Sequence, residues 1–291
     1  MSTAVVLMAY GSPDSLADVP AYYADIRGGR PIAPEHLEDL VARYRALGIE
    51  DHNPLNAITE GTRAALEHEL GLPVFTGMRH WQPRIAEAVE RALATGAETL
   101  VGLVLAPHYS GMSIGKYRAL FEEAAAGRAE TVFVDRWGSE PAYVEWLAEQ
   151  VEGTDAHVVF TAHSLPERIL AAGDPYRDEL LETSRLVAGR AGVGDWSFAF
   201  QSAAPTGEPW LGPDVLDHLE ALHADGVRDV LVCSIGFVSD HLEIRWDLDT
   251  EAAQKAEELG MRLARTPMPN ADPEFVRVLA GVVERAVGAR A

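Results

Sequence analysis

Short apolar runs alternate with longer stretches of helical period along almost the whole chain, and this alternation constrains the fold more than any other feature. Strand-length runs followed by amphipathic stretches predict an α/β protein, in which helices cover both faces of a mostly parallel sheet. The predicted strands span residues 4–9, 73–78, 99–105, 130–134, 156–161, 197–200, 230–233 and 261–265. The clearest amphipathic stretches span residues 35–47, 84–94, 142–151 and 213–224, and Pro213 is expected at the first helical position of the last one.

About eight strands in a chain of 291 residues suggest two similar half-sheets. The segment Arg136-Trp137-Gly138-Ser139-Glu140-Pro141 follows the fourth predicted strand and marks the expected boundary near residue 140. In folds of this class, ligands bind beyond the carboxyl ends of the strands, so those ends are the segments to inspect for a site.

Four side chains with coordinating or acid–base chemistry lie at predicted strand ends: Tyr10, His108, His163 and His241. His163 lies at the end of the strand predicted at residues 156–161, where a neutral imidazole can bind a metal or accept a proton near neutral pH. A lone histidine is also a common structural residue, so both interpretations of His163 stay open at this point.

The segment that follows His241 carries three acidic residues at a spacing of four: Glu243, Asp247 and Glu251. On an α-helix this spacing places them on one slowly drifting face, where their mutual repulsion costs roughly 0.2–0.5 kcal/mol per pair. A bound cation would remove that cost, and carboxylates suit a hydrated divalent ion in transit. A solvated acidic face beside Lys255 explains the same spacing.

Composition excludes several classes of function. A net charge of −21 repels nucleic acid and anionic membranes. No segment has the length and apolarity of a transmembrane helix, and the N-terminus lacks the basic region of a signal peptide. The single cysteine, Cys233, cannot form an intramolecular disulfide or supply an all-cysteine iron–sulfur site within one chain. These features predict a cytoplasmic protein that does not bind nucleic acid and is not an integral membrane protein.

Nine segments, in order along the chain, resemble the ferrochelatase family. They are Met8-Ala9-Tyr10-Gly11-Ser12-Pro13, the segment from Tyr22 to Pro31, Asn53-Pro54-Leu55, Gly77-Met78-Arg79-His80, Leu105-Ala106-Pro107-His108-Tyr109-Ser110, Ala162-His163-Ser164-Leu165-Pro166, Gly173-Asp174-Pro175-Tyr176, Gln201-Ser202 with Trp210-Leu211-Gly212-Pro213-Asp214, and Asp240-His241-Leu242-Glu243. Each motif alone is weak, whereas nine in register over nearly the whole chain are specific.

The resemblance implies two Rossmann-like, chelatase-type domains, residues 1–140 and 141–291, with an interdomain cleft and a C-terminal helix near residues 273–287 that packs back on the first domain. It implies a lyase that inserts Fe²⁺ into a porphyrin in haem biosynthesis, with His163 and Glu243 as catalytic and metal-binding residues that face each other across the centre of the porphyrin. Asp247 and Glu251 then extend the metal path on a helix with a π-type widening.

The resemblance also suggests substrate-binding residues: Tyr10, Arg27, Arg43, Asn53, Ser110, Ser113 and Tyr117. Asn53 departs from the family, which usually has a small hydroxyl residue there, so its contact with a porphyrin propionate is in doubt. Many members carry a cysteine-ligated [2Fe–2S] cluster, which this chain cannot, so it resembles the cluster-free branch. The expected partners are the porphyrin and Fe²⁺ as substrates, with no tightly bound cofactor, transient contact with a haem-pathway enzyme, and a monomeric state.

The choice of porphyrin depends on the segment after Tyr10. Residues 14–20 are acidic and short of large apolar side chains, which favours coproporphyrin III, with four propionates, over protoporphyrin IX. The alternatives are a protoporphyrin IX ferrochelatase, a cobalt or nickel chelatase for a sirohydrochlorin-like ring, and a haem-binding or haem-transfer module. An acidic scaffold without any site is a further alternative.

Overall fold

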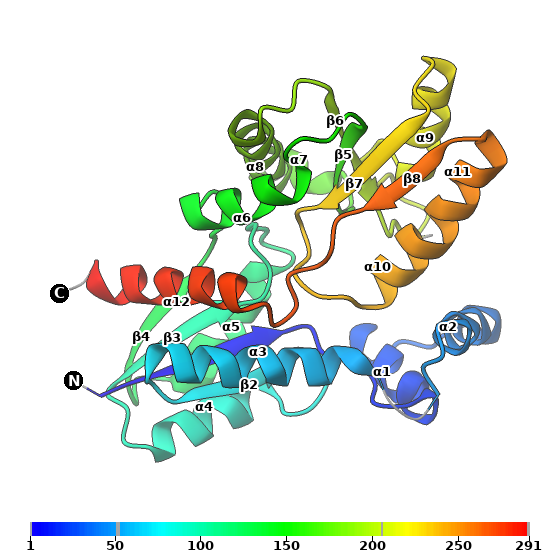
Figure 1. The fold of residues 1–291 in the computed structure, drawn as a ribbon. Helices are drawn as coiled ribbons and strands as arrows, with labels where there is room; N and C mark the ends of the chain where they lie inside the picture. Colours follow the sequence, from blue (N-terminus) through cyan, green and yellow to red (C-terminus); the bar gives the residue numbers. More distant parts are fainter. Residues whose placement is uncertain (1, 51–52, 205, 290–291) are drawn as a thin grey trace.

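Two four-stranded parallel sheets form the framework of the chain in a computed structural model that describes residues 2–50, 53–204 and 206–289 (Figure 1). The first sheet contains β1 (Thr3–Ala9), β2 (Val74–Met78), β3 (Thr99–Val104) and β4 (Glu130–Val134). The second sheet contains β5 (His157–His163), β6 (Trp196–Gln201), β7 (Asp229–Ser234) and β8 (Arg262–Arg265). Both the α/β class and the two half-sheets predicted from the apolar runs are confirmed.

The two sheets have the same strand order, β2-β1-β3-β4 in the first and β6-β5-β7-β8 in the second. All strand pairs within them are parallel, so the carboxyl ends of the strands in each sheet lie along one edge. Helices on both faces shield the strands from water, which explains why the central strands are apolar along their whole length. All six residues of β3, for example, are buried.

Helices fill the connections between strands. They are α1 (Val19–Ile26), α2 (Pro34–Ala46), α3 (Pro54–Leu70), α4 (Ile85–Ala94), α5 (Ile114–Ala125), α6 (Pro141–Val151), α7 (Arg168–Ala171), α8 (Tyr176–Ala191), α9 (Val215–Ala224), α10 (Leu242–Trp246), the π-helix η2 (Asp247–Ala252), α11 (Ala253–Leu259) and α12 (Pro273–Gly288); a 3₁₀ turn, η1 (Leu16–Asp18), precedes α1.

The start of α9 differs from the sequence-based prediction. Asp214 caps this helix by accepting a hydrogen bond from the main-chain N–H of Leu216 at 2.9 Å, so Pro213 precedes the cap and is not the first helical residue. The carbonyl of Pro213 instead accepts a hydrogen bond from the N–H of Phe200. This bond extends the pairing at the end of β6, which is why the helix starts later than its apolar period indicates.

The two halves share one hydrophobic core. It contains residues of both sheets together with α6, α8 and α12. Helix α12 lies between α6 of the second half and α3 of the first, and it also contacts β4 (Figure 1). The aromatic rings of Trp137, Tyr143 and Phe275 pack against one another at this junction, with centroids 4.8–6.3 Å apart. The halves are thus joined by packing, and a domain boundary at residue 140 stays a prediction.

Helices α1 and α2 of the first half reach across to α10 of the second. Arg245 donates a hydrogen bond to the carbonyl of Leu47 at 3.3 Å, and the guanidinium of Arg43 lies 5.3 Å from the ring centre of Trp246. Leu242 packs in the same small core as Val19 of α1. Within the described residues, no helix is long and apolar enough to cross a membrane.

Candidate active site at the carboxyl ends of the strands

His163, the last residue of β5, is held with one ring nitrogen toward the protein. Its Nδ1 donates a hydrogen bond to the main-chain carbonyl of Ser164, and because a carbonyl only accepts, the lone pair of the neutral ring lies on Nε2. The hydroxyl of Tyr176 donates to the carbonyl of His163 at 3.0 Å. The rings of Trp210 and Phe237 stand 6.4 and 6.3 Å from the imidazole. Nε2 is therefore the ring nitrogen left free to bind a ligand, and aromatic rings surround the imidazole.

Glu243 lies in the first turn of α10, which His241 caps. Nδ1 of His241 accepts hydrogen bonds from the N–H groups of Glu243 and Ile244 at 3.1 and 3.3 Å. Burial lowers the pKa of His241, which keeps the ring neutral and able to accept these bonds. The side-chain amide of Gln201, at the end of β6, donates to the carbonyl of Glu243 at 2.9 Å. The backbone that carries the Glu243 carboxylate is thus held from two sides.

Nε2 of His163 and Oε2 of Glu243 are 3.6 Å apart. This distance contradicts the expectation that the two groups face each other across a porphyrin. A flat ring needs contacts of about 3.5 Å on each face, hence about 7 Å between flanking atoms. His163 and Glu243 instead form one pair on one side of the site, because both project from the same sheet edge.

The helix after Glu243 widens into the π-helix η2, as the family resemblance implied. In a π-helix, hydrogen bonds join residues five apart, so four residues make slightly less than one full turn. In an α-helix, four residues make slightly more than one turn. The π-helix therefore offsets the rotation that the α-helical turns before it introduce between acidic residues spaced four apart. Asp247 is almost fully buried and accepts a hydrogen bond from Ser202. Burial and the charges of Glu243 and Glu251 raise the pKa of Asp247 to about 7, against the lowering effect of Ser202.

Asp247 and Glu251 line a cavity of about 150 Å³ that involves both halves of the chain. Arg43 of α2 contributes one wall, and Gln201, Ser202 and Asp214 contribute others. In residues 2–50, 53–204 and 206–289, no three His, Cys, Asp or Glu side chains are grouped closely enough to hold a metal ion. The four residues predicted as metal ligands are therefore spread along the site and share no single coordination sphere in this structure.

The first half supplies a group of aromatic and cationic side chains at the ends of its strands. Tyr10 follows β1, and the guanidinium of Arg79 lies 6.0 Å from its ring centre and 5.6 Å from that of Tyr117. Tyr10 is 43% exposed, but partial desolvation and the charge of Glu243 raise its pKa to about 12, so the Glu243 carboxylate acts electrostatically across the boundary between the halves. The ring of His80 packs 4.6 Å from that of Tyr10, and its Nδ1 contacts Asp25 at 2.8 Å.

The structure gives two predicted substrate residues other roles. Asn53 is buried, caps α3 by accepting from the N–H of Leu55, and donates to the hydroxyl of Ser12. Ser110 is fully buried and donates to the carboxylate of Asp174 at 2.9 Å, which ties the first half to the second. In this conformation neither side chain is presented to a ligand, so their predicted propionate contacts lack structural support.

The remaining predicted contacts are in different positions. Tyr117 is buried behind Arg79, and Ser113 is partly exposed just before α5. Arg43 pairs with Asp39 at 2.9 Å and reaches the small cavity described above. Arg27 follows α1, and its Nε is buried without a hydrogen-bond partner among the described residues. No contact links Arg27 to His163 or Glu243, so its role stays a prediction.

The structure assigns roles to three residues that the sequence places at strand ends: His108, Arg79 and His241. His108 is buried and bonded to Thr183 of α8 at 2.9 Å, and burial lowers its pKa to about 3, so it joins the halves and does not belong to the site. Arg79 and His241 lie at strand ends and were noted there, but only the cation–π contacts and the helix cap reveal what they do.

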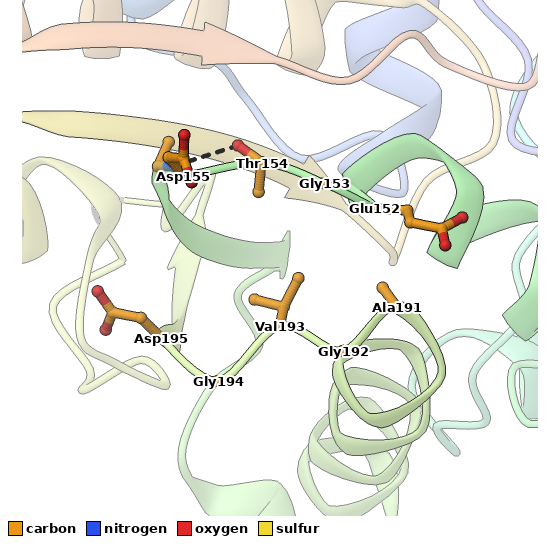
Figure 2. Close-up of a pocket in the computed structure, with 10 residues that line it drawn as sticks. Glu152, Gly153, Thr154, Asp155, Ala191, Gly192, Val193, Gly194 and Asp195 are labelled. Carbon is orange, nitrogen blue, oxygen red and sulfur yellow. Dashed lines mark hydrogen bonds between the residues drawn. The ribbon is translucent and has the colours of Figure 1, made fainter.

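A second cavity lies elsewhere on the molecule. A cavity of about 440 Å³ is bounded by two turns, residues 152–156 and 191–195, at the amino ends of β5 and β6 (Figure 2). It is lined by glycines, small residues and the carboxylates of Glu152, Asp155 and Asp195. His163 lies at the opposite end of β5, so this depression is separate from the candidate site.

Known proteins resemble this chain over nearly its whole length. A family model described as Ferrochelatase matches residues 2–287. The chain is 42% identical to a ferrochelatase from Deinococcus radiodurans, over 97% of this chain and 95% of the relative. It is 41% identical to a coproporphyrin III ferrochelatase from Geobacillus kaustophilus, over 96% and 94% of the two chains. The solved structure of SirB from Bacillus subtilis with Fe³⁺ has a TM-score of 0.63 at 11% identity, over 98% and 96%, which shows a similar fold alone.

Proposed function

Because the chain belongs to the ferrochelatase family, and is thus a metal chelatase, we propose that it inserts Fe²⁺ into coproporphyrin III to give coproheme, with His163 and Glu243 at the metallation centre. The observation that carries this proposal is the imidazole–carboxylate pair, 3.6 Å apart at a sheet edge. The same pair distinguishes this chain from a passive haem carrier, because a carrier needs no proton acceptor beside the porphyrin ring.

Metal insertion replaces two pyrrole protons by one Fe²⁺ ion, so the site must accept two protons for each turnover. Nε2 of His163 carries the lone pair needed to accept the first, because Nδ1 is committed to the Ser164 carbonyl. Glu243, beside it, accepts the second or stabilises the imidazolium that forms. Both groups lie on one side of the site, so protons leave the ring from the face opposite Tyr10.

Fe²⁺ approaches along the acidic series. Glu251 and Asp247 line the small cavity, and Glu243 follows them toward His163. Oxygen ligands spread along a path exchange a hydrated divalent ion readily, whereas a closed ligand set would retain it. Asp247, with its pKa raised to about 7, loses its proton when a cation arrives, since a nearby positive charge favours the carboxylate.

The preference for coproporphyrin III is supported by charge and by the rim of the site. Arg79 forms no ion pair with any residue that the structure describes, which leaves its guanidinium available to a propionate. In residues 14–20 the exposed positions are Asp14, Ala17 and Pro20, while Val19 is buried, so the rim offers no large apolar surface for vinyl groups. The Geobacillus relative named for this porphyrin supports the same choice.

The decisive experiment is an anaerobic insertion assay with coproporphyrin III and protoporphyrin IX in parallel, followed by the Soret band. We expect kcat/KM to favour coproporphyrin III by roughly tenfold or more, since one charge-assisted hydrogen bond contributes about 1.5–3 kcal/mol. His163→Ala should lose most of the insertion rate while it still binds porphyrin. Equal use of both porphyrins would contradict the substrate, and a wild-type rate in His163→Ala would contradict the site.

The same assay separates the other candidates. A sirohydrochlorin-type chelatase would prefer Co²⁺ or Ni²⁺ with a different ring, and a haem-transfer protein would bind haem without inserting iron. A cytoplasmic location, a monomeric state, the absence of a [2Fe–2S] cluster and transient contact with a haem-pathway enzyme remain predictions from the sequence.

A further inference from the structure

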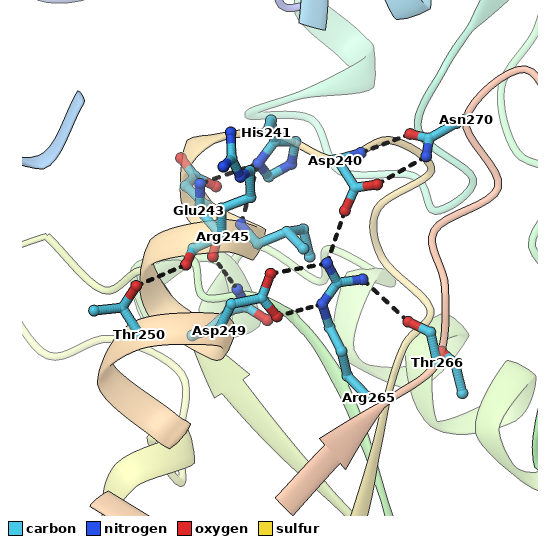
Figure 3. Close-up of polar contacts among 11 residues, drawn as sticks. Asp240, His241, Glu243, Arg245, Asp249, Thr250, Arg265, Thr266 and Asn270 are labelled. Carbon is cyan, nitrogen blue, oxygen red and sulfur yellow. Dashed lines mark hydrogen bonds and ion pairs between the residues drawn. The ribbon is translucent and has the colours of Figure 1, made fainter. Parts of the chain in front are cut away.

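Arg265, the last residue of β8, joins two carboxylates that flank the Glu243 segment in sequence (Figure 3). Its Nε and Nη2 donate to both oxygens of Asp249 at 2.5 and 2.9 Å, and Nη2 also reaches Asp240 at 2.9 Å. Nη1 donates to the carbonyl of Thr266 at 3.1 Å. The side chain is only 19% exposed, so all three nitrogens are used in a partly buried setting.

The two carboxylates bracket the functional stretch. Asp240 precedes the cap of α10, whereas Asp249 lies inside the π-helix η2. Residues two apart on a helix point to nearly opposite faces, so Asp249 faces Arg265 while Asp247 faces Ser202 and the cavity. Arg265 thus neutralises Asp240 and Asp249, which face away from the site. Glu243, Asp247 and Glu251 keep their carboxylates toward the site.

Asp240 has a second partner that fixes the cap region. Asn270 donates from its side-chain amide to Asp240 at 2.8 Å, and its Oδ1 accepts from the N–H of Asp240 at 2.8 Å. The backbone of Asn270 bonds Val238, and its carbonyl accepts a hydrogen bond from Thr62 of α3 in the first half. Arg265 therefore connects the helix of Glu243 both to β8 and, through Asp240 and Asn270, to the other half.

From these contacts we propose that Arg265 is a positioning residue: it holds the segment from Asp240 to Asp249 so that Glu243 stays beside His163 and the acidic path keeps its register. This inference rests on the proposed function, in which Glu243 handles metal and protons. The guanidinium touches neither His163 nor Glu243, so it acts through the helix. A lysine could keep the charge but could not hold Asp249 by two nitrogens and Asp240 at once.

The test compares three variants by steady-state metallation: Arg265→Lys, Arg265→Gln, and the triple variant Arg265→Gln/Asp240→Asn/Asp249→Asn. The triple variant leaves no unpaired carboxylate behind, so its defect reports the lost clamp and not an uncompensated charge. Arg262→Gln is the matched control, because Arg262 lies on the same strand and pairs with exposed Asp229 far from the site. Circular dichroism melting shows whether each variant is folded under assay conditions.

A misplaced Glu243 should affect the metal and leave porphyrin binding intact. We expect the KM for Fe²⁺ to rise and kcat to fall by a combined roughly 10–100-fold in Arg265→Lys and in the triple variant, since misplacing a catalytic group by about 1 Å has effects of that size. The KM for the porphyrin should stay within about twofold, which separates this role from general destabilisation. The absorption of Co²⁺, used as a probe of the metal path, should change in the same variants.

Wild-type KM for Fe²⁺ in both Arg265→Lys and the triple variant would overturn the proposal, and so would an equal rise in both KM values. Glu243→Gln in the same assay distinguishes the two levels of failure. If Glu243→Gln inserts iron normally, the proposed function is wrong. If Glu243→Gln is impaired while the folded Arg265 variants are not, only the role of Arg265 is wrong.

Discussion

Nε2 of His163 and Oε2 of Glu243 lie 3.6 Å apart at the carboxyl edge of the second sheet, whereas Tyr10 follows β1 of the first sheet. The pair forms because β5 ends, and the loop after β7 begins, at the same edge of the second sheet, as the parallel pairing of these two strands requires. The first half contributes Tyr10 and Arg79 from the ends of β1 and β2. The two sheets have the same strand order, but their carboxyl edges carry different side chains. The second sheet supplies the proton acceptors His163 and Glu243, and the first supplies Tyr10 and the cationic Arg79.

Glu243→Gln tests the carboxylate of this pair. Glutamine has nearly the same shape but can neither accept a proton nor attract a cation, so we expect kcat to fall by roughly 10²–10⁴-fold. Porphyrin affinity, measured by fluorescence quenching, should be nearly unchanged. Glu257→Gln, which removes an exposed carboxylate from α11, is the control and should retain full activity. A Glu243→Gln enzyme within about threefold of wild type would contradict the proposed function, which places Glu243 at the metallation centre.

The framework was predictable because strand burial leaves a local signal. All eight predicted strands match observed ones within about two residues at each end, since most are apolar runs between turn residues. The predicted start of α9 was wrong, because the hydrogen bond from Phe200 to Pro213 is a long-range contact that the helical period of the sequence does not reveal. The shared strand order of the two sheets also depends on pairing between distant segments and has no local signal.

The candidate site was predictable in its residue types but not in its arrangement. His108 and His163 both follow predicted strands, yet Thr183 of α8 makes the first a buried structural residue. Asn53 serves as a helix cap, and Ser110 bonds Asp174, a partner far away in sequence. Arg79 gains its place from the rings of Tyr10 and Tyr117, and only the folded chain brings these together.

Arg79→Met should weaken porphyrin binding selectively. The substitution keeps an apolar stem between Tyr10 and Tyr117 but removes the charge proposed to meet a propionate, so the KM for coproporphyrin III should rise by roughly 10–100-fold. The KM for Fe²⁺ should not change. Arg91→Met is the matched control, since Arg91 also stacks on a ring, that of Phe75 at 5.2 Å, but on another face of the molecule. Similar porphyrin KM values in both variants would show that Arg79 has only a packing role.

Gly236→Ala should loosen the support of His163. A Cβ at position 236 would lie 2.5 Å from Cβ and 3.0 Å from Cα of Ala162, the residue before His163. The backbone must shift, so we expect a loss of roughly 1–3 kcal/mol in the free energy of unfolding and slower insertion. Gly189→Ala, inside α8 with nothing within 4 Å of the added Cβ, should instead stabilise by up to about 1 kcal/mol. Urea denaturation measures both, and equal effects would contradict the predicted contact.

Asp247→Asn should stabilise the protein in a pH-dependent way. The folded state raises the pKa of Asp247 to about 7 from an ordinary value of 3.8, because the carboxyl is buried beside Glu243 and Glu251. Between these values the folded protein holds a proton that the unfolded chain has released, so stability falls as pH rises from about 4 to 7, and the full penalty persists above 7. At about 1.4 kcal/mol for each unit of pKa, the upper limit of that penalty is roughly 4 kcal/mol.

Asparagine carries no such penalty and can still accept the hydrogen bond from Ser202. The difference in unfolding free energy between Asp247→Asn and wild type should therefore be largest at pH 8 and shrink toward zero near pH 4. Asp217→Asn, which removes an exposed carboxylate from α9, should show little pH dependence of this kind. The stabilised Asp247→Asn enzyme should also need more Fe²⁺ for half-maximal insertion, because the path loses an anionic step. A constant difference across pH 4–8 would mean that Asp247 does not titrate near neutrality.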